Sequence, residues 1–269
     1  MNITLARAAA PGVRLSAVTP GTARIFLLEA HSEFLRLLRA PSFSVPTIVF
    51  PLMFYVLFGI LLGPGRAHPQ AGPRVLASFM VLGTMAPGLF ALGITLATDR
   101  ERGLLELKRA LPMPRGLYLA AKVAMSMLFA AVVSVLLIVL AALAAGVTLT
   151  LLRWSLLLVL AVVGVIPFCA VGLLVGALCK ASAAPAVLNL IYLPISFLSG
   201  LWVPLSMLPR PLSQLAPLWP SWQLAQIAEA VVGSAPAAAV PGHALALAAV
   251  AGACLAAARR ALGRAKLTR

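Results

Sequence analysis

The chain has 269 residues, of which 62% are hydrophobic and only 10% are charged, whereas a soluble globular domain carries roughly 25% charged residues. A water-soluble surface cannot be built from this composition, and little length is left for a separate soluble catalytic domain. Because the apolar residues fall in long runs, the sequence predicts one all-α integral membrane protein.

The formal net charge is +15, from 21 Lys and Arg against six Asp and Glu. In a soluble protein this balance would indicate nucleic-acid binding. Here the basic residues lie between apolar runs, where cytoplasmic loops meet anionic headgroups, so we expect membrane lipids as partners and no nucleic acid. The three cysteines lie inside apolar stretches at spacings that match no metal or disulfide framework, and we expect them to pack in the core.

Stretches without Asp, Glu, Lys or Arg mark the membrane spans, because a charge at the bilayer centre costs at least ~2.5 kcal/mol. A spanning helix needs about 20 residues, and six of these charge-free stretches are long enough. A six-helix transmembrane domain is therefore predicted at residues 41–262, between cytoplasmic tails at 1–21 and 263–269. Its predicted spans are 43–63, 76–97, 121–145, 155–178, 184–203 and 242–259.

The positions of the basic residues predict the orientation. With both termini in the cytoplasm, 17 of the 21 basic residues lie inside, and Arg66, Arg74, Arg153 and Arg210 lie outside. This division follows the positive-inside rule. In the link between the fourth and fifth spans, Lys180 is the one basic residue that indicates a cytoplasmic location.

Residues 22–40 precede the first span and form an amphipathic pattern. Leu27, Leu28, Phe34, Leu35 and Leu38 share one side, and Glu29, Glu33 and Arg36 share the other. The pattern predicts a helix in the headgroup plane that ends at Pro41. It serves either as a membrane-surface anchor or as a contact surface for a cytoplasmic partner.

The loop between the second and third spans contains three of the six acidic residues. Leu104, Leu107 and Leu111 recur at helical spacing opposite Glu106 and Arg109, before two prolines. We predict a short amphipathic helix over residues 99–111 that docks on protein; the alternative is that it lies against lipid.

The region from Gly200 to Gly242 is rich in proline and contains three of the four tryptophans. Proline forbids one continuous helix, and tryptophan favours the membrane interface. We therefore predict short external helices that partly re-enter the outer leaflet before the last span. Glu229, near the end of this region, is expected to face water.

The charge-free stretches also exclude classes of function. Ion-coupled carriers and charge-selective channels place ionisable groups within the membrane. The sequence contains neither a GxxxxGK[ST] phosphate loop nor an HExxH motif, so we predict no ATP hydrolysis, no metal site and no cofactor in this chain. Transport would then need energy from a partner.

Three segments resemble the ABC-2 type permeases, the membrane subunits of one class of ATP-binding-cassette exporters. Glu33-Phe-Leu-Arg-Leu-Leu-Arg-Ala-Pro41 is similar to the family's interfacial helix, and Arg100 to Arg115, followed by Lys122, looks like its Glu-Arg-Gly-Thr-x-Glu loop. Phe197-Leu-Ser-Gly-Leu-Trp-Val-Pro204, with the prolines that follow, resembles the segment closing its fifth span. Leu104 stands where the family often has Thr, and Ala110-Leu111 stand where a Thr commonly precedes the Pro.

The resemblance covers residues 22 to about 260 and implies a dimer with a second permease copy or paralogue, above two ABC ATPase subunits that bind ATP and Mg. In the implied coupling helix, Gly103 would let the backbone approach the ATPase closely and the leucines would be buried in the contact. The charged residues would set the orientation and register of the helix on the ATPase. The implied ATPase-contacting residues are Asp99, Arg100, Glu101, Arg102, Gly103, Leu104 and Leu107. The implied interfacial-helix residues are Glu33, Arg36 and Arg39, and the implied external gate region contains Ser199, Gly200, Pro204, Pro209, Pro217 and Pro220.

We therefore expect a multi-pass permease subunit of the bacterial cytoplasmic (inner) membrane, not an enzyme, for ATP-driven export of an amphipathic, lipidic or drug-like substrate. The few polar residues in the spans, such as Asn189 and Tyr192, favour this cargo over a highly charged one. One alternative is a non-transporting membrane scaffold or assembly factor that recruits an ATPase. Another is an intramembrane enzyme that depends on a residue such as Ser199 or Asn189.

Overall fold

A computed structural model describes residues 22–62, 71–104 and 116–264 of the chain. All regular structure in these ranges is helical, which confirms the all-α prediction. The main helices are α1 (Thr22–Leu38), α2 (Pro41–Phe54), α3 (Ala71–Ala86), α4 (Leu92–Glu101), α6 (Leu117–Leu143), α7 (Leu151–Leu178), α8 (Ala184–Leu198), α9 (Arg210–Leu215), α10 (Pro220–Val232) and α11 (Val240–Arg264). Wider π-helical turns at Tyr55–Leu61 and Pro87–Ala91 extend α2 and join α3 to α4.

Within the described ranges, five helical segments are long and apolar enough to cross a membrane. They are Pro41–Leu61, Ala71–Glu101, Leu117–Leu143, Leu151–Leu178 and Ala237–Leu262. Each matches one of the six predicted spans, so the chain has the architecture of a multi-pass membrane protein.

The predicted fifth span, 184–203, is shorter than expected. Helix α8 has 15 residues and ends at Leu198, which at about 1.5 Å per residue is less than the roughly 30 Å of a hydrocarbon core. It ends there because Gly200 takes a left-handed backbone conformation, with φ +76°, and Pro204 follows. Five short segments then lead to the last long helix: Leu205–Met207, α9, Ala216–Leu218, α10 and Ala237–Ala239.

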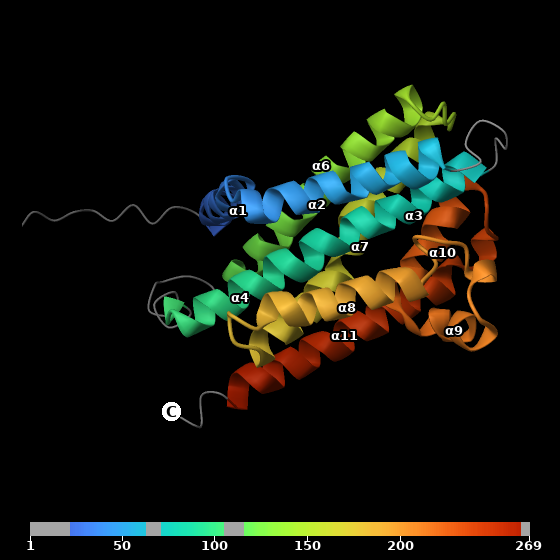
Figure 1. Ribbon diagram of the computed structural model, residues 1–269. Coiled ribbons are helices and arrows are strands. Elements are labelled where there is room, and N and C mark those ends of the chain that lie inside the picture. Colours follow the sequence, from blue (N-terminus) through green and yellow to red (C-terminus); the bar gives the residue numbers. More distant parts are fainter. Residues whose placement is uncertain (1–21, 63–70, 105–115, 265–269) are drawn as a thin grey trace, which may run out of the picture.

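The long helices run alongside one another, and the joined α3–α4 helix lies among them (Figure 1). Helix α1, the last turn of α4 and the end of α11 lie at one end of the bundle, and α9 and α10 lie at the other (Figure 1). Every residue of α3 from Phe79 to Ala86 is buried, whereas α11 is exposed along most of its length.

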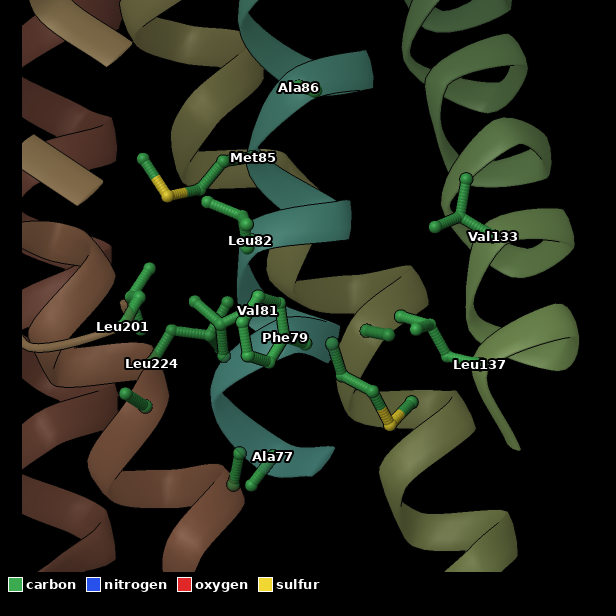
Figure 2. Close-up of a cluster of buried hydrophobic side chains, with 14 of the residues drawn as sticks. Ala77, Phe79, Val81, Leu82, Met85, Ala86, Val133, Leu137, Leu201 and Leu224 are labelled. Atoms are coloured by element: carbon green, nitrogen blue, oxygen red, sulfur yellow. The ribbon is translucent and has the colours of Figure 1, made fainter. Parts of the chain in front are cut away.

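The core is built around α3. Figure 2 shows side chains of α3 between those of α6 on one side and those of α10 and the turn after α8 on the other. The residues that meet there are Phe79, Leu82 and Met85 of α3, Val133 and Leu137 of α6, Leu201 and Leu224, and none is more than 2% exposed. Close packing of this kind is the main attraction between helices in a bilayer.

Glycines bring α4 against α7. A Cβ atom on Gly172 would lie 2.6 Å from the carbonyl oxygen of Leu89, in the π-helical turn before α4, and one on Gly176 would lie 2.6 Å from that of Gly93 in α4. The two helices therefore touch through their backbones, as small residues four apart allow. This contact fixes the last turn of α4 beside the end of α7.

Candidate functional site

The charged segment at residue 99 continues the spanning helix. Asp99, Arg100 and Glu101 form the last turn of α4, so the helix predicted at residues 99–111 does not begin at residue 99. The α-helical hydrogen bonding runs on through the Arg102 N–H to the Thr98 carbonyl, 3.0 Å apart. Leu107 and the remainder of the predicted leucine stripe lie outside the described residues.

Gly103 ends this helix with a φ of +69°. Among the residues that the structure describes, a Cβ atom there would meet nothing within 4 Å, so the glycine serves the turn and not close packing against those residues. The neighbouring Arg102 side chain is exposed and Leu104 is half-buried. Both are therefore accessible to another protein at this end of the bundle.

Asp99 lies in a buried cluster of charges instead. The Lys122 ammonium on α6 is 3.1 Å from Asp99 Oδ2 and 3.2 Å from Glu33 Oε1 on α1. The lysine side chain is 0% exposed and the two carboxylates are 4% and 6% exposed. Tyr118 of α6 donates a hydrogen bond to Asp99. One cation thus joins α1, α4 and α6, so Asp99 does not face outward as a partner contact would.

Arg36 closes this cluster on the solvent side. Its guanidinium lies 2.6 Å from Glu33 Oε2 and 4.0 Å from Asp99 Oδ1. The predicted polar side of α1 therefore turns inward at Glu33, while Leu27 and Leu28 are 65% and 58% exposed. Glu33 turns inward because its carboxylate pairs with the buried ammonium of Lys122. Arg39, which follows α1, is exposed.

Arg100 and Glu101 bind the turn between α7 and α8. Arg100 donates hydrogen bonds to the carbonyls of Ala177 and Cys179, the latter at 2.7 Å. These carbonyls lie at the negative end of α7, where a cation is stabilised. Glu101 Oε1 accepts a hydrogen bond from the Ala181 N–H at 2.8 Å. The last turn of α4 is therefore bonded to α1, α6 and the α7–α8 turn, and we call this set of contacts the α4 junction.

A groove lies beside the junction, between α2, the π-helical turn before α4, and α8. Its volume is about 710 Å³, and no charged side chain of the described residues lines it. Aromatic rings form much of its wall, with Phe90 and Tyr192 in edge-to-face contact at 5.5 Å. Asn189, Thr47 and Thr95 add polar groups. This α2–α8 groove suits an amphipathic molecule, because apolar walls with a few polar groups are typical of ligand sites.

The residues of the predicted external gate lie at the α10 end of the bundle. Ser199 and Ser221 are buried and hydrogen bonded to each other at 2.5 Å. The prolines punctuate the short helices: Pro204 precedes Leu205–Met207, Pro209 precedes α9, Pro217 lies in Ala216–Leu218, and Pro220 begins α10. Short helices are therefore confirmed in this region.

The expectation that Glu229 faces water is wrong. Its side chain is buried against α3, where Arg74 Nε donates a hydrogen bond to its Oε1 at 3.1 Å. Arg74 and Glu229 line a hollow of about 560 Å³ between α3, residues 199–205 and α10, which we call the α10 hollow. Sequence reasoning missed this pair because the two residues are far apart in the chain.

Other functional side chains were also missed. Lys122 was counted among the cytoplasmic basic residues, although the predicted span 121–145 contains it and it lies in α6. Its position four residues after Tyr118, at the start of an apolar run, was the available signal. No group of side chains within the described ranges could hold a metal ion. All three cysteines are free, and Cys169 is buried in the core as predicted.

Comparison with known proteins adds two findings. A model of the family described as "ABC-2 type transporter" matches residues 26–228. The chain is also 24% identical over 210 residues to the "Putative transport permease YvfS" of Bacillus subtilis (strain 168), an alignment that covers 77% of this chain and 86% of that protein.

Proposed function

Because the chain belongs to the ABC-2 type transporter family, we propose that it is the permease subunit of an exporter driven by a separate ABC ATPase. The family is one of transport permeases and not of enzymes. The proposed unit pairs this chain with a second permease copy or paralogue and with two ATPase subunits, which bind ATP and Mg.

The α4 junction is the observation that carries this proposal. A partner that pushes on Arg102, Leu104 and the residues that follow acts directly on the last turn of α4. That turn is bonded to α1 and α6 through Lys122 and to the α7–α8 turn through Arg100 and Glu101. Packed helices shift as units and do not bend continuously. A local push would therefore move most of the bundle, including α8 at the edge of the groove.

We assign the α2–α8 groove to the cargo. It lies between the elements that the junction would move, and its uncharged lining favours an amphipathic, lipidic or drug-like molecule. Opposite the junction, the short helices before α11 would re-enter the outer leaflet and act as the external gate. Tryptophan and proline in this region support that placement.

The proposed orientation puts the α4 junction in the cytoplasm, in a bacterial inner membrane. Helix α1 and the end of α11 lie at the same end of the bundle (Figure 1). Three of the four basic residues predicted to be external lie at the end of the bundle that contains α9 and α10. Arg74 and Arg153 contact α10, and Arg210 begins α9. Both observations support two cytoplasmic termini.

Partner contact and transmission can be tested separately. The full chain, tagged and expressed in its own host, is purified with its ATPase after introduction of Arg102→Glu or Leu104→Lys. We expect both variants to lose the ATPase while inserting normally, because they place a wrong charge on the exposed side of the junction. Gln214→Lys, at the exposed opposite end, is the matched control and should retain the ATPase. Retention of the ATPase and of transport by Arg102→Glu and Leu104→Lys would overturn the proposal.

The second candidate function is a scaffold that recruits an ATPase without transport. The uncharged lining of the α2–α8 groove is compatible with both a permease and a scaffold. Proteoliposomes containing the permease and its ATPase separate the two. A permease will show hydrolysis stimulated by amphipathic compounds and accumulation of one of them, whereas a scaffold will show neither.

A further inference from the structure

Helix α10 is held by two arginines from different helices. Arg74 of α3 pairs with Glu229, as described above. Arg153 of α7 donates a hydrogen bond to the Val232 carbonyl, 3.2 Å away. Both contacts lie in the last turn of α10, just before Gly233, which has a φ of +86° and ends the helix. Cations are stabilised at this end of a helix, so the last turn of α10 is clamped from both sides.

The two arginine contacts differ in the group that is left unpaired when the contact is lost. Arg153 contacts a backbone carbonyl, which a water molecule can satisfy in its place. Glu229 has a charged side chain that is only 10% exposed, and the ion pairs of the described residues give it one partner, Arg74. A buried carboxylate without its partner is strongly unfavourable. Breaking the Arg74–Glu229 pair would therefore destabilise the last turn of α10 more than breaking the Arg153 contact.

This pair lines the α10 hollow. Phe58, Phe79 and Trp202 form an aromatic wall, and α10 contributes Trp222 and Gln226. At the other end of α10, the hydrogen bond between Ser199 and Ser221 ties the helix to the end of α8. On its α10 side, the hollow is therefore bounded by a helix with two side-chain contacts. A neutral hydrogen bond, Ser199–Ser221, holds the start of α10, and the Arg74–Glu229 ion pair holds its last turn.

We propose that Arg74 and Glu229 are positioning residues of the outer gate: their ion pair latches α10 across the α10 hollow, and the latch opens when cargo leaves. This inference rests on the proposed orientation, in which α10 is external. The exposed Arg74 side chain, 60% accessible against 10% for Glu229, is the partner that can move into water, since its charge is already half solvated.

The test measures access to the hollow and needs no substrate. Cys169, Cys179 and Cys254 are replaced by Ala in the full chain, and Gln226→Cys supplies a reporter on the hollow-lining side of α10. A membrane-impermeant maleimide is added to the outside of intact cells. We expect Arg74→Gln and Glu229→Gln each to accelerate labelling at least about tenfold, the change that about 1.4 kcal/mol produces.

Charge reversal separates a latch from general disruption. The double variant Arg74→Glu with Glu229→Arg restores the pair with opposite polarity, and its labelling should return to within about threefold of the parent, or less than 1 kcal/mol. Arg210→Gln removes an exposed cation from the same end of the bundle and should leave the rate unchanged. Ser78→Cys, on the α3 side of the hollow, is a second reporter in case the first reduces expression.

Labelling of the single variants at the parental rate would overturn the latch, and so would a double variant that labels as fast as the singles. Reaction only from the cytoplasmic face would overturn the external placement of α10 and with it the inference. Co-purification with the ATPase is measured on the same membranes. Its loss counts against the proposed function alone, because the labelling rate decides the latch independently.

Discussion

The ammonium of Lys122 lies 3.1 Å from Asp99 and 3.2 Å from Glu33, on three different helices, with its side chain completely buried. A lysine in this position is stable only because two carboxylates and the Tyr118 ring surround it; the ring centroid is 4.9 Å from the ammonium. The relation of Lys122 to its two acids therefore holds the α4 junction together.

Removing this cation should be costly. We expect Lys122→Ala to destabilise the purified protein by roughly 3–5 kcal/mol, because it leaves Glu33 and Asp99 buried with less compensation. The measurement is the loss of monodisperse protein on heating in detergent. Lys180→Ala, which removes an exposed lysine, is the control and should change stability little.

Neutralising the three buried charges should repair the defect. The triple variant Glu33→Gln, Asp99→Asn and Lys122→Met keeps the side-chain shapes and removes all three charges, which is often neutral or stabilising in other proteins. We expect it to recover most of the lost stability. Equal stability of Lys122→Ala and Lys180→Ala would show that the cluster is not a structural anchor.

Glu101 should protect the α7–α8 turn. Its carboxylate accepts the Ala181 N–H at 2.8 Å, and hydrogen bonds to charged groups contribute about 1.5–3 kcal/mol. We expect Glu101→Gln to accelerate hydrogen exchange in the peptide that contains Ala181 by about tenfold or more, with ATPase binding retained. Arg102→Gln, one residue away, should leave this exchange unchanged. An unaltered exchange rate in Glu101→Gln would remove this link from the junction.

The glycine contact between α4 and α7 should tolerate no larger side chain. Gly176→Leu places a side chain where a Cβ atom already lies 2.6 Å from the Gly93 carbonyl oxygen. Overpacking of this kind costs about 1–3 kcal/mol or more, so we expect a large loss of folded protein in size-exclusion profiles. Gly252→Leu on α11 is the matched control, because a Cβ atom there meets nothing within 4 Å in the described part of the chain. Similar yields from both variants would contradict the close packing.

The α2–α8 groove should set the cargo preference. Asn189 lines it and donates a hydrogen bond to the Pro185 carbonyl at 3.0 Å. We expect Asn189→Leu to change which amphipathic compounds stimulate hydrolysis in proteoliposomes, because it removes a polar group from an apolar wall. Leu190→Ala changes the adjacent side chain, which is 74% exposed and lies outside the groove. An identical response in both variants would remove Asn189 from the cargo site.

The helices themselves were predictable from the sequence. Every long helix coincides with a predicted span because a bilayer leaves the backbone no partners except its own, so a long apolar run must become a helix. A helix was predicted at 22–40 and is observed at Thr22–Leu38, since Pro41 cannot continue it. The short α8 was not foreseen, because the left-handed turn at Gly200 leaves no mark on hydropathy.

Contacts between helices were not predictable. Glu33, Asp99 and Lys122 are separated by 66 and 23 positions in the chain, and Arg74 and Glu229 by 155. The sequence predicted none of these pairings, because periodicity along one helix does not say which neighbour its polar face will meet. The sequence by itself determined that the chain crosses the bilayer and where its charges are concentrated. Only the packing of the helices decided that several of those charges are buried, because a buried charge is stable only where the fold brings its counter-charge within about 3–4 Å.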